Sequence, residues 1–165
     1  MGPLRFVGVT ALVDRTSDIQ ALIDDKARIP PQAVRAAIDD ALDRFVNQAY
    51  RAAKCRRDGD VLACRLEAAQ APDAFLEVLF AVNGGRLRPY AKHLLWELET
   101  RPLRASPWRP EELAALLAAA LGEEPIAPLQ VMLIGLETLT RQAGHGAVLD
   151  AWGSGLDWLK RWSPG

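Results

Sequence analysis

One long segment, residues 31–57, constrains the fold of this sequence more than any other feature. Its apolar side chains recur every three or four residues, the spacing that places them on one side of an α-helix. These side chains are Val34, Ile38, Leu42, Phe45, Val46 and Ala49. A proline opens the segment, where the first turn of a helix tolerates it, and Asp58-Gly59 follows its end. The sequence thus predicts one long amphipathic helix, which must bury its apolar side against other elements.

Most of the remaining sequence also has helical spacing, divided by prolines and glycines. Further helices are predicted at residues 17–27, 61–69, 73–82, 90–99, 111–121, 125–142 and 147–162. The exception is the β-branched apolar run at residues 5–13, which predicts a short strand. A lone strand leaves backbone groups unpaired, so it needs a partner. We therefore predict an all-α bundle of six to eight helices over residues 16–165, preceded by a strand and linker at residues 1–15.

Composition argues against several functional classes. The 165 residues suit one domain, half of them are apolar, and the net charge of −1 argues against broad electrostatic binding of nucleic acids or membranes. No segment approaches about 18 consecutive apolar residues, so we predict no membrane span, and no signal peptide is evident. Cys55 and Cys64 lack the spacing of metal ligands, so we expect free thiols, no bound metal and a cytoplasmic location.

The charges are unevenly distributed along the chain. Residues 44–109 carry 12 basic and 7 acidic side chains, whereas acidic side chains outnumber basic ones on both sides of this stretch. Two groups contain much of the excess, a basic row along the long helix and a basic turn further along the chain. The basic row consists of Asn47, Tyr50, Arg51, Lys54, Arg57 and Asp58, and the basic turn of Arg88, Pro89, Tyr90 and Lys92.

These residue types suit an anionic ligand. Arginine offers a planar fork and lysine a point charge to phosphate oxygens, and the start of a helix also favours an anion. The two groups therefore predict an electropositive groove between two helices that holds a triphosphate or another anionic substrate. The alternative is a solvated surface with ion pairs to Asp43, Asp58 and Glu97, each contributing less than about 1 kcal/mol.

Two sequence patterns resemble a known group of proteins. The first pattern is residues 47–59 (NQAYRAAKCRRDG) followed by residues 63–69 (ACRLEAA), and the second is residues 79–84 (LFAVNG) followed by residues 88–94 (RPYAKHL). Together they resemble the C-terminal helical domain of bacterial nucleotidyltransferase-fold proteins, a group that includes relatives of the aminoglycoside nucleotidyltransferases. The resemblance covers about residues 5–105. It implies a helical domain that closes over a nucleotide, while a separate β-sheet domain holds the metal-binding carboxylates.

The catalytic signature of that group is absent from this sequence. The signature is a Gly-Ser pair that opens a helix, followed by two acids one residue apart on a strand; such acids hold divalent metal ions. The only Gly-Ser pair here is Gly153-Ser154, and Asp157 after it has no acid two places on. The resemblance thus implies no cofactor in this chain and Mg²⁺ with the nucleotide only if a catalytic partner is present. Residues 5–13 would then be the last strand of the missing sheet.

We therefore predict a helical domain that binds a nucleoside triphosphate or another anionic substrate and needs a separate catalytic domain for transfer. Its partner would be that domain or a second copy in a homodimer. The predicted binding residues are Asn47, Tyr50, Arg51, Lys54, Arg88, Tyr90, Lys92 and Glu97. With a catalytic partner, Arg51 and Lys54 would bind the triphosphate, and Glu97 would orient a cationic acceptor.

Two other functions stay open at this point. Arg88 and His93 have the spacing of a signature found in some helical-bundle ribonucleases, in which the arginine stabilises phosphorane charge and the histidine acts as general base. Alternatively, the chain is a non-enzymatic interaction module whose strand at residues 5–13 docks on the sheet edge of a partner.

Three further expectations concern residues outside these sites. His145 lies between two glycines and is expected in a loop, and the adjacent Asp39 and Asp40 are expected as acids on a helix surface, because neighbours on a helix do not share a face. The tryptophans are expected in the core because each ring buries a large apolar area. They are Trp96, Trp108, Trp152, Trp158 and Trp162.

Overall fold

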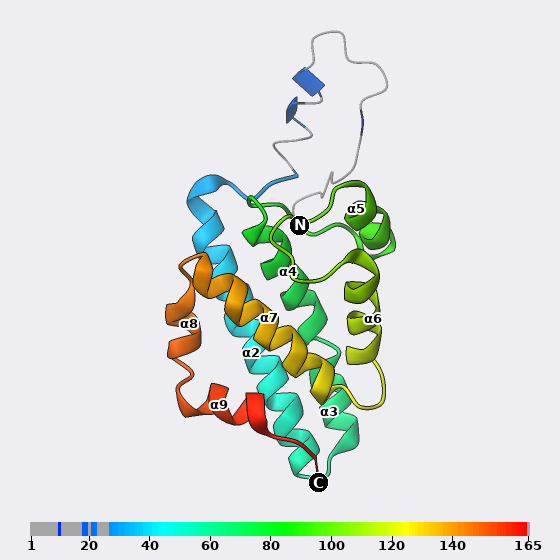
Figure 1. Cartoon of the computed structure of the whole chain (residues 1–165), viewed down its shortest axis with the longest axis vertical. Helices are drawn as coiled ribbons and strands as arrows, with labels where there is room; N and C mark the ends of the chain where they lie inside the picture. Colours follow the sequence, from blue (N-terminus) through cyan, green and yellow to red (C-terminus); the bar gives the residue numbers. More distant parts are fainter. Residues whose placement is uncertain (1–9, 11–17, 20, 23–26, 165) are drawn as a thin grey trace.

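The computed structural model describes residues 10, 18–19, 21–22 and 27–164, and these residues form an all-α bundle, as predicted (Figure 1). The elements are η1 (Pro31–Ala33), α2 (Val34–Arg57), α3 (Val61–Ala68), α4 (Ala71–Val82), η2 (Ala91–His93), α5 (Leu94–Thr100), α6 (Pro110–Ala120), α7 (Ile126–Gln142), α8 (Gly146–Asp150) and α9 (Ser154–Arg161), where η marks a 3-10 helix. The strand predicted at residues 5–13 lies outside the described residues, apart from Thr10. Of the helix predicted at residues 17–27, the described residues 18–19 and 21–22 are helical.

Helix α2 is the long amphipathic helix predicted from the sequence. Its buried residues follow the helical period and pack mainly against α3 and α4. They are Ile38, Ala41, Leu42, Phe45, Val46, Ala49, Ala52 and Ala53. The helix ends at Arg57 with Asp58 as its C-cap, and Gly59 after it has a φ of +82°, which glycine adopts without steric cost. Asp60 then caps α3, because its carboxylate accepts a hydrogen bond from the backbone N–H of Ala63.

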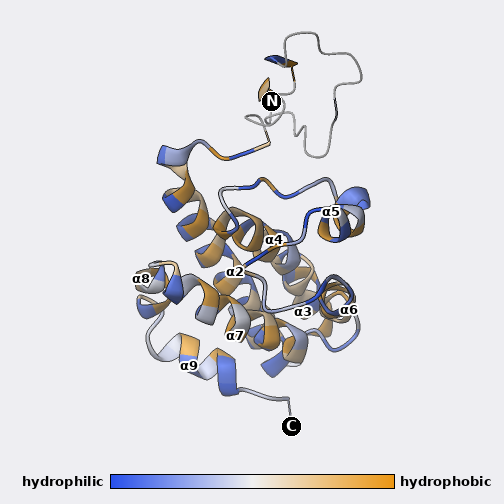
Figure 2. Ribbon diagram, turned by 45° about the horizontal axis from the view of Figure 1, so that its top comes forward, coloured by the Kyte–Doolittle hydropathy of each residue, from blue (hydrophilic) through white to orange (hydrophobic). Residues whose placement is uncertain are grey.

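Helix α4 is the most completely buried element among the described residues. Nine of its residues are buried, and they are Ala71, Pro72, Ala74, Phe75, Leu76, Val78, Leu79, Phe80 and Ala81. Pro72 lies in the first turn of this helix, where the missing N–H costs nothing, and therefore does not separate α3 from α4 as the sequence suggested. Hydrophobic residues of α2, α4 and α7 face one another in the middle of the bundle (Figure 2).

Helix α7 crosses α2 in Figure 1. Its Gly135 lies in close contact with the indole of Trp108. A Cβ atom on Gly135 would lie 2.3 Å from Cη2 of Trp108, whose indole also packs against the ring of Phe75 at a centroid distance of 5.4 Å. No real Cβ approaches a ring carbon so closely, so glycine is what lets Trp108 cover the middle of α7. The tryptophan thereby links the loop before α6 to the core.

The C-terminal region differs from the prediction of one helix at residues 147–162. The structure divides it into α8 and α9, and Gly153 between them has a φ of +50°. Helix α9 is held to α7 by the side-chain amide of Gln130, which donates to the carbonyl oxygens of Leu159 at 2.7 Å and Trp162 at 2.6 Å. The predicted helix at residues 90–99 is likewise divided, into η2 and α5.

The expected burial of the tryptophans is correct for four of the five rings. Trp108, Trp152, Trp158 and Trp162 pack against the core, whereas Trp96 on α5 is half exposed. The thiol of Cys64 is buried, and this burial raises its pKa above the ordinary value for cysteine. None of the described helices is long and apolar enough to span a membrane.

Candidate ligand-binding cleft

A cleft of about 1000 Å³ opens at the end of the bundle where α2 begins and where α4 and α7 end. Most of its described lining is apolar. These lining residues are Ile29, Pro30, Pro31, Val34, Ile38, Ala81, Val82, Leu87 and Ala143, with Gly84 and Gly85. Three polar side chains, those of Arg28, Gln32 and His145, complete the described lining. The cleft therefore has a mainly apolar lining with a few polar groups, which is the usual composition of a small-molecule site.

One rim of the cleft is a short antiparallel bridge between Arg28 and Arg86. The backbone N–H of Ile29 donates to the carbonyl of Gly85 at 2.7 Å, and that of Leu87 donates to the carbonyl of Ala27 at 3.0 Å. Gly85 has a φ of +69°, and a Cβ there would lie 3.1 Å from Cγ2 of Val34. A glycine is thus required for the segment after α4 to reach the chain before α2.

The innermost polar group is the imidazole of His145. The residue is 6% exposed, and its Nδ1 lies 2.6 Å from Oδ1 of Asp39 on α2. Gly144, with a φ of +84°, turns the chain at the end of α7, and the backbone N–H of His145 donates to the carbonyl of Thr140. His145 lies in the turn between α7 and α8, as the sequence predicts, but its side chain is buried. Asp39, expected as an acid on the helix surface, is its hydrogen-bond partner.

The contact with Asp39 involves only one of the two ring nitrogens of His145. Nδ1 is the atom in the hydrogen bond, and Nε2 has no hydrogen-bond partner among the described residues. His145 is also one of the residues that line the cleft. The exposed guanidinium of Arg28 likewise forms no ion pair with a described residue.

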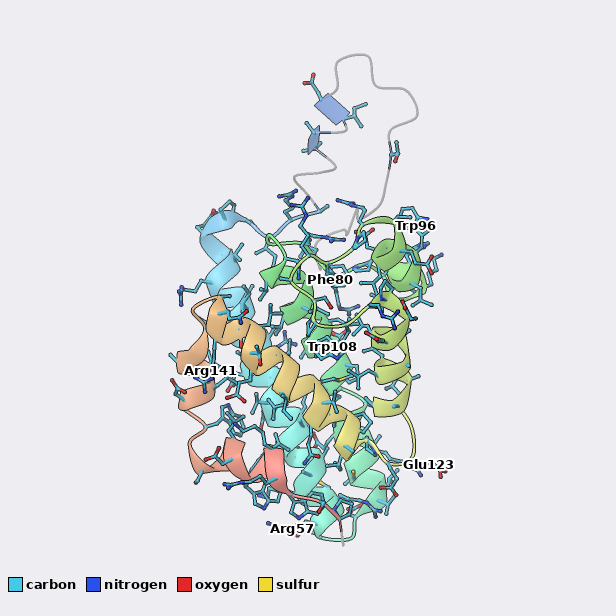
Figure 3. All side chains as sticks on the ribbon, in the orientation of Figure 1. Arg57, Phe80, Trp96, Trp108, Glu123 and Arg141 are labelled. Atoms are coloured by element: carbon cyan, nitrogen blue, oxygen red, sulfur yellow. The ribbon has the colours of Figure 1, made fainter. Side chains whose placement is uncertain are left out.

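The basic row of α2 lies elsewhere, toward the other end of the bundle, where Figure 3 labels Arg57. Its arginines are paired with carboxylates of the protein. Arg51 lies 2.6 Å from Glu67 of α3, and Nε of Arg57 lies 2.8 Å from Oδ1 of Asp58. The hydrogen bond from Arg57 lowers the pKa of Asp58 below its ordinary value. A ligand phosphate would have to replace these carboxylates.

Tyr50, the aromatic member of the basic row, is also engaged. Its ring lies 5.6 Å from that of Trp152 and 5.2 Å from that of Trp158, measured between centroids. The ammonium of Lys54 lies 5.7 Å from the centre of the Tyr50 ring, and Asn47 is exposed. The tyrosine therefore docks the C-terminal region on α2. Lys54 is exposed and forms no ion pair with a described residue.

The basic turn is at the opposite end from the basic row. Arg88 forms an ion pair with Asp73 of α4 and lies 4.0 Å from Glu77, so its guanidinium is directed toward α4. Tyr90 is 66% exposed, and the Lys92 ammonium lies 5.8 Å from the centre of its ring. The structure thus does not bring the basic row and the basic turn into the single groove that the sequence predicts (Figures 1 and 3).

Glu97, predicted to orient a cationic acceptor, is buried in α5. It is 1% exposed, and its Oε1 lies 2.6 Å from Arg86 and 3.6 Å from Arg101. Arg86 also lies over the ring of Phe80, with 5.1 Å between Cζ and the ring centre. These contacts fasten the segment after α4 to α5, so the carboxylate is already held by two cations of the protein.

The proposed ribonuclease pair can also be located. Arg88 precedes η2 and is directed toward the acids of α4, whereas His93 is exposed at the junction of η2 and α5, with its ring 6.4 Å from that of Tyr90. His93 has no carboxylate partner among the described residues that would orient its ring. The buried and oriented histidine of this protein is His145.

No protein-family model matches the sequence, and neither a curated protein nor a solved structure matches it. Likewise, the described residues contain no group of three or more histidine, cysteine, aspartate or glutamate residues placed to hold a metal ion.

Proposed function

We propose that this protein binds a small, largely apolar molecule in the cleft and that His145 makes the main polar contact with it. The observation that carries the proposal is the pair formed by Asp39 and His145. A buried imidazole is held at Nδ1 by a carboxylate, its Nε2 has no hydrogen-bond partner among the described residues, and the residue lines an apolar cleft. Such a second partner fixes the orientation and tautomer of a histidine that acts on another molecule.

The size and lining of the cleft support the same proposal. Clefts of roughly 300 to 1000 Å³ enclose most of the surface of a small ligand, and a few polar groups in an apolar wall fix its orientation. This cleft has that volume and only three polar side chains in its described lining. Two smaller pockets among the described residues have volumes of about 210 and 170 Å³, too small for more than a fragment.

The nucleotidyltransferase relationship and nucleotide binding by the basic row stay predictions from the sequence. The arginines of that row are neutralised within the protein, which favours the cleft as the ligand site. A requirement for a catalytic-domain partner, for a second copy, or for Mg²⁺ with a nucleotide belongs to the same prediction.

The proposal is tested by binding of Nile red, an uncharged dye whose fluorescence rises in apolar sites, to the full-length protein. Val82 lines the cleft and is half-buried, so Val82→Arg places a charged side chain in it. Val131 on α7 is 48% exposed and is outside the described lining, so Val131→Arg is the matched control. We expect Val82→Arg to weaken binding about tenfold and Val131→Arg to leave it unchanged.

Circular dichroism establishes that both variants are folded before they are compared. Equal probe affinity in the wild type and in folded Val82→Arg would show that the cleft is not the binding site. Displacement of the bound probe by decanol or decanoate provides the same test with ligands that lack an aromatic ring.

A further inference from the structure

Resting on the proposed function, we infer that the ligand is an amphipathic monoanion, an apolar chain or ring system with one acid group, and that this acid group contacts Nε2 of His145. An apolar cleft alone does not define the chemical class of its ligand. The basic side chains in the described lining, and the lack of acidic ones there, favour an acid group.

The described lining of the cleft contains no acidic side chain. Arg28 and His145 are its ionisable members, and neither an aspartate nor a glutamate accompanies them. The one acid that contacts this set is Asp39, and its Oδ1 is occupied by Nδ1 of His145. Among the described residues, a cationic ligand would therefore find no free counter-ion in this apolar cleft, and an unpaired charge is costly in a region of low dielectric.

The positive charge of Arg28 is not paired with a carboxylate of the described residues. The backbone of Arg28 is held at the rim by the bridge to Arg86, and its side chain is exposed and forms no ion pair with a described residue. Most arginines of the bundle are paired with carboxylates, as Arg51 and Arg88 are. A positive charge left over at the rim of an apolar cleft favours an anion over a neutral molecule of the same shape.

The two nitrogens of the His145 ring have different hydrogen-bonding roles. Because Nδ1–H is directed at the Asp39 carboxylate, Nε2 is an acceptor in the neutral ring and a donor in the imidazolium. The Asp39 carboxylate holds Nδ1, so Nε2 is the ring nitrogen left to meet the ligand. When the ring is an imidazolium, Nε2–H donates to an oxygen of the ligand's acid group, a charge-assisted hydrogen bond stronger than one between neutral groups.

His145 and Arg28 thus have different roles. His145 contacts the acid group directly from the wall of the cleft, and its ring is held at Nδ1 by Asp39. Arg28 supplies the net positive charge at the rim. The apolar part of the ligand packs against Val34, Ile38 and Val82.

The test compares decanoate with decanol, which share a chain and differ in charge, by calorimetry on the full-length protein. We expect the wild type to bind decanoate about tenfold more tightly than decanol, a difference of about 1.4 kcal/mol. Arg28→Gln and His145→Gln should each reduce this ratio severalfold while decanol affinity stays within about threefold of wild type. Arg104 is exposed and outside the cleft, so Arg104→Gln is the control and should keep the full ratio.

The outcomes separate the two proposals. If neither compound binds the wild type, the proposed function itself fails. If decanol binds as tightly as decanoate, or if the ratio is unchanged in both Arg28→Gln and His145→Gln, the cleft binds apolar ligands but the inferred acid group is wrong. Arg28 is exposed, so its variant is expected to fold even if His145→Gln does not.

Discussion

The two ends of helix α2 use polar residues in opposite ways. Near its C-terminal end, the arginines of the basic row are paired with carboxylates from α3 and from the cap of α2 itself. Near its N-terminal end, the cleft has fewer charged groups, but Nε2 of His145 and the guanidinium of Arg28 have no partner among the described residues. The number of charges in a region is therefore a poor guide to its capacity to bind a ligand. What matters is how many charges the protein leaves uncompensated.

The largest effect is expected from a buried ion pair next to the cleft. Glu97 is 1% exposed and holds Arg86, so Glu97→Ala leaves a cation of low exposure without its partner. Removal of one partner from a buried pair costs about 3 to 5 kcal/mol. We expect that loss of unfolding free energy in urea denaturation. Glu99 on the same helix is exposed, and Glu99→Ala should cost less than about 0.5 kcal/mol.

His145→Ala should have an intermediate effect. It removes the partner of Asp39, whose side chain is 31% exposed and is thus partly able to regain water. We expect a loss of about 2 kcal/mol in unfolding free energy. The double-mutant cycle with Asp39→Asn isolates the pair. A coupling energy close to zero would show that the two side chains do not stabilise each other.

The basic row should contribute less to stability than either site at the cleft end. Arg51 is 59% exposed and Glu67 is 17% exposed, so solvent screens this pair. Arg51→Ala should lower the unfolding free energy by less than about 1 kcal/mol, and 1 M NaCl should remove part of the difference. A loss equal to that of His145→Ala would contradict the contrast between the two ends.

The nucleotide prediction is tested on the same surface. Because Arg51 is paired with Glu67 and Lys54 lies against the Tyr50 ring, we expect Arg51→Ala/Lys54→Ala to change the affinity for ATP with Mg²⁺ by less than about threefold in calorimetry. Micromolar ATP binding by the wild type that the double variant loses would instead support the basic row as a nucleotide site.

The smallest effect concerns Asp58. Its pKa is lowered by the hydrogen bond from Arg57, so the pair stabilises the folded state at neutral pH, and this contribution is lost as the pH falls through the lowered pKa. In an NMR titration, we expect the Asp58 carboxyl of Arg57→Ala to titrate at higher pH than that of the wild type. Both groups are exposed, so denaturation midpoints at pH 7 should barely differ.

Regular periodicity explains what the sequence could predict about the fold. The apolar spacing of residues 34–53 defines α2, and Gly59 marks its end, so both bounds follow from local rules. The break between α8 and α9 has no proline, and only Gly153, with its positive φ, could have indicated it. Pro72 was misleading because a proline in the first turn of a helix and a proline between helices look alike in sequence.

The candidate site was less predictable, because its contacts join distant residues. His145 and Asp39 are 106 residues apart, and Arg51 and Glu67 are 16 apart on different helices. Local sequence shows that a cation is present but not which carboxylate pairs with it. The one local signal for His145 was its position between two glycines, which indicates a tight turn and says nothing about burial.

The contact between His145 and Asp39 also bears on the order of folding. Helices α2, α3 and α4 follow one another in sequence and pack together, so this half of the chain can assemble through local contacts. The cleft, by contrast, needs the loop of more than one hundred residues between Asp39 and His145 to close. The binding site should therefore be among the last parts of the protein to form and the first to be lost when the C-terminal helices detach. A bound ligand would oppose that detachment, so occupancy of the cleft should be detectable as slower amide exchange in α7, far along the chain from Arg28.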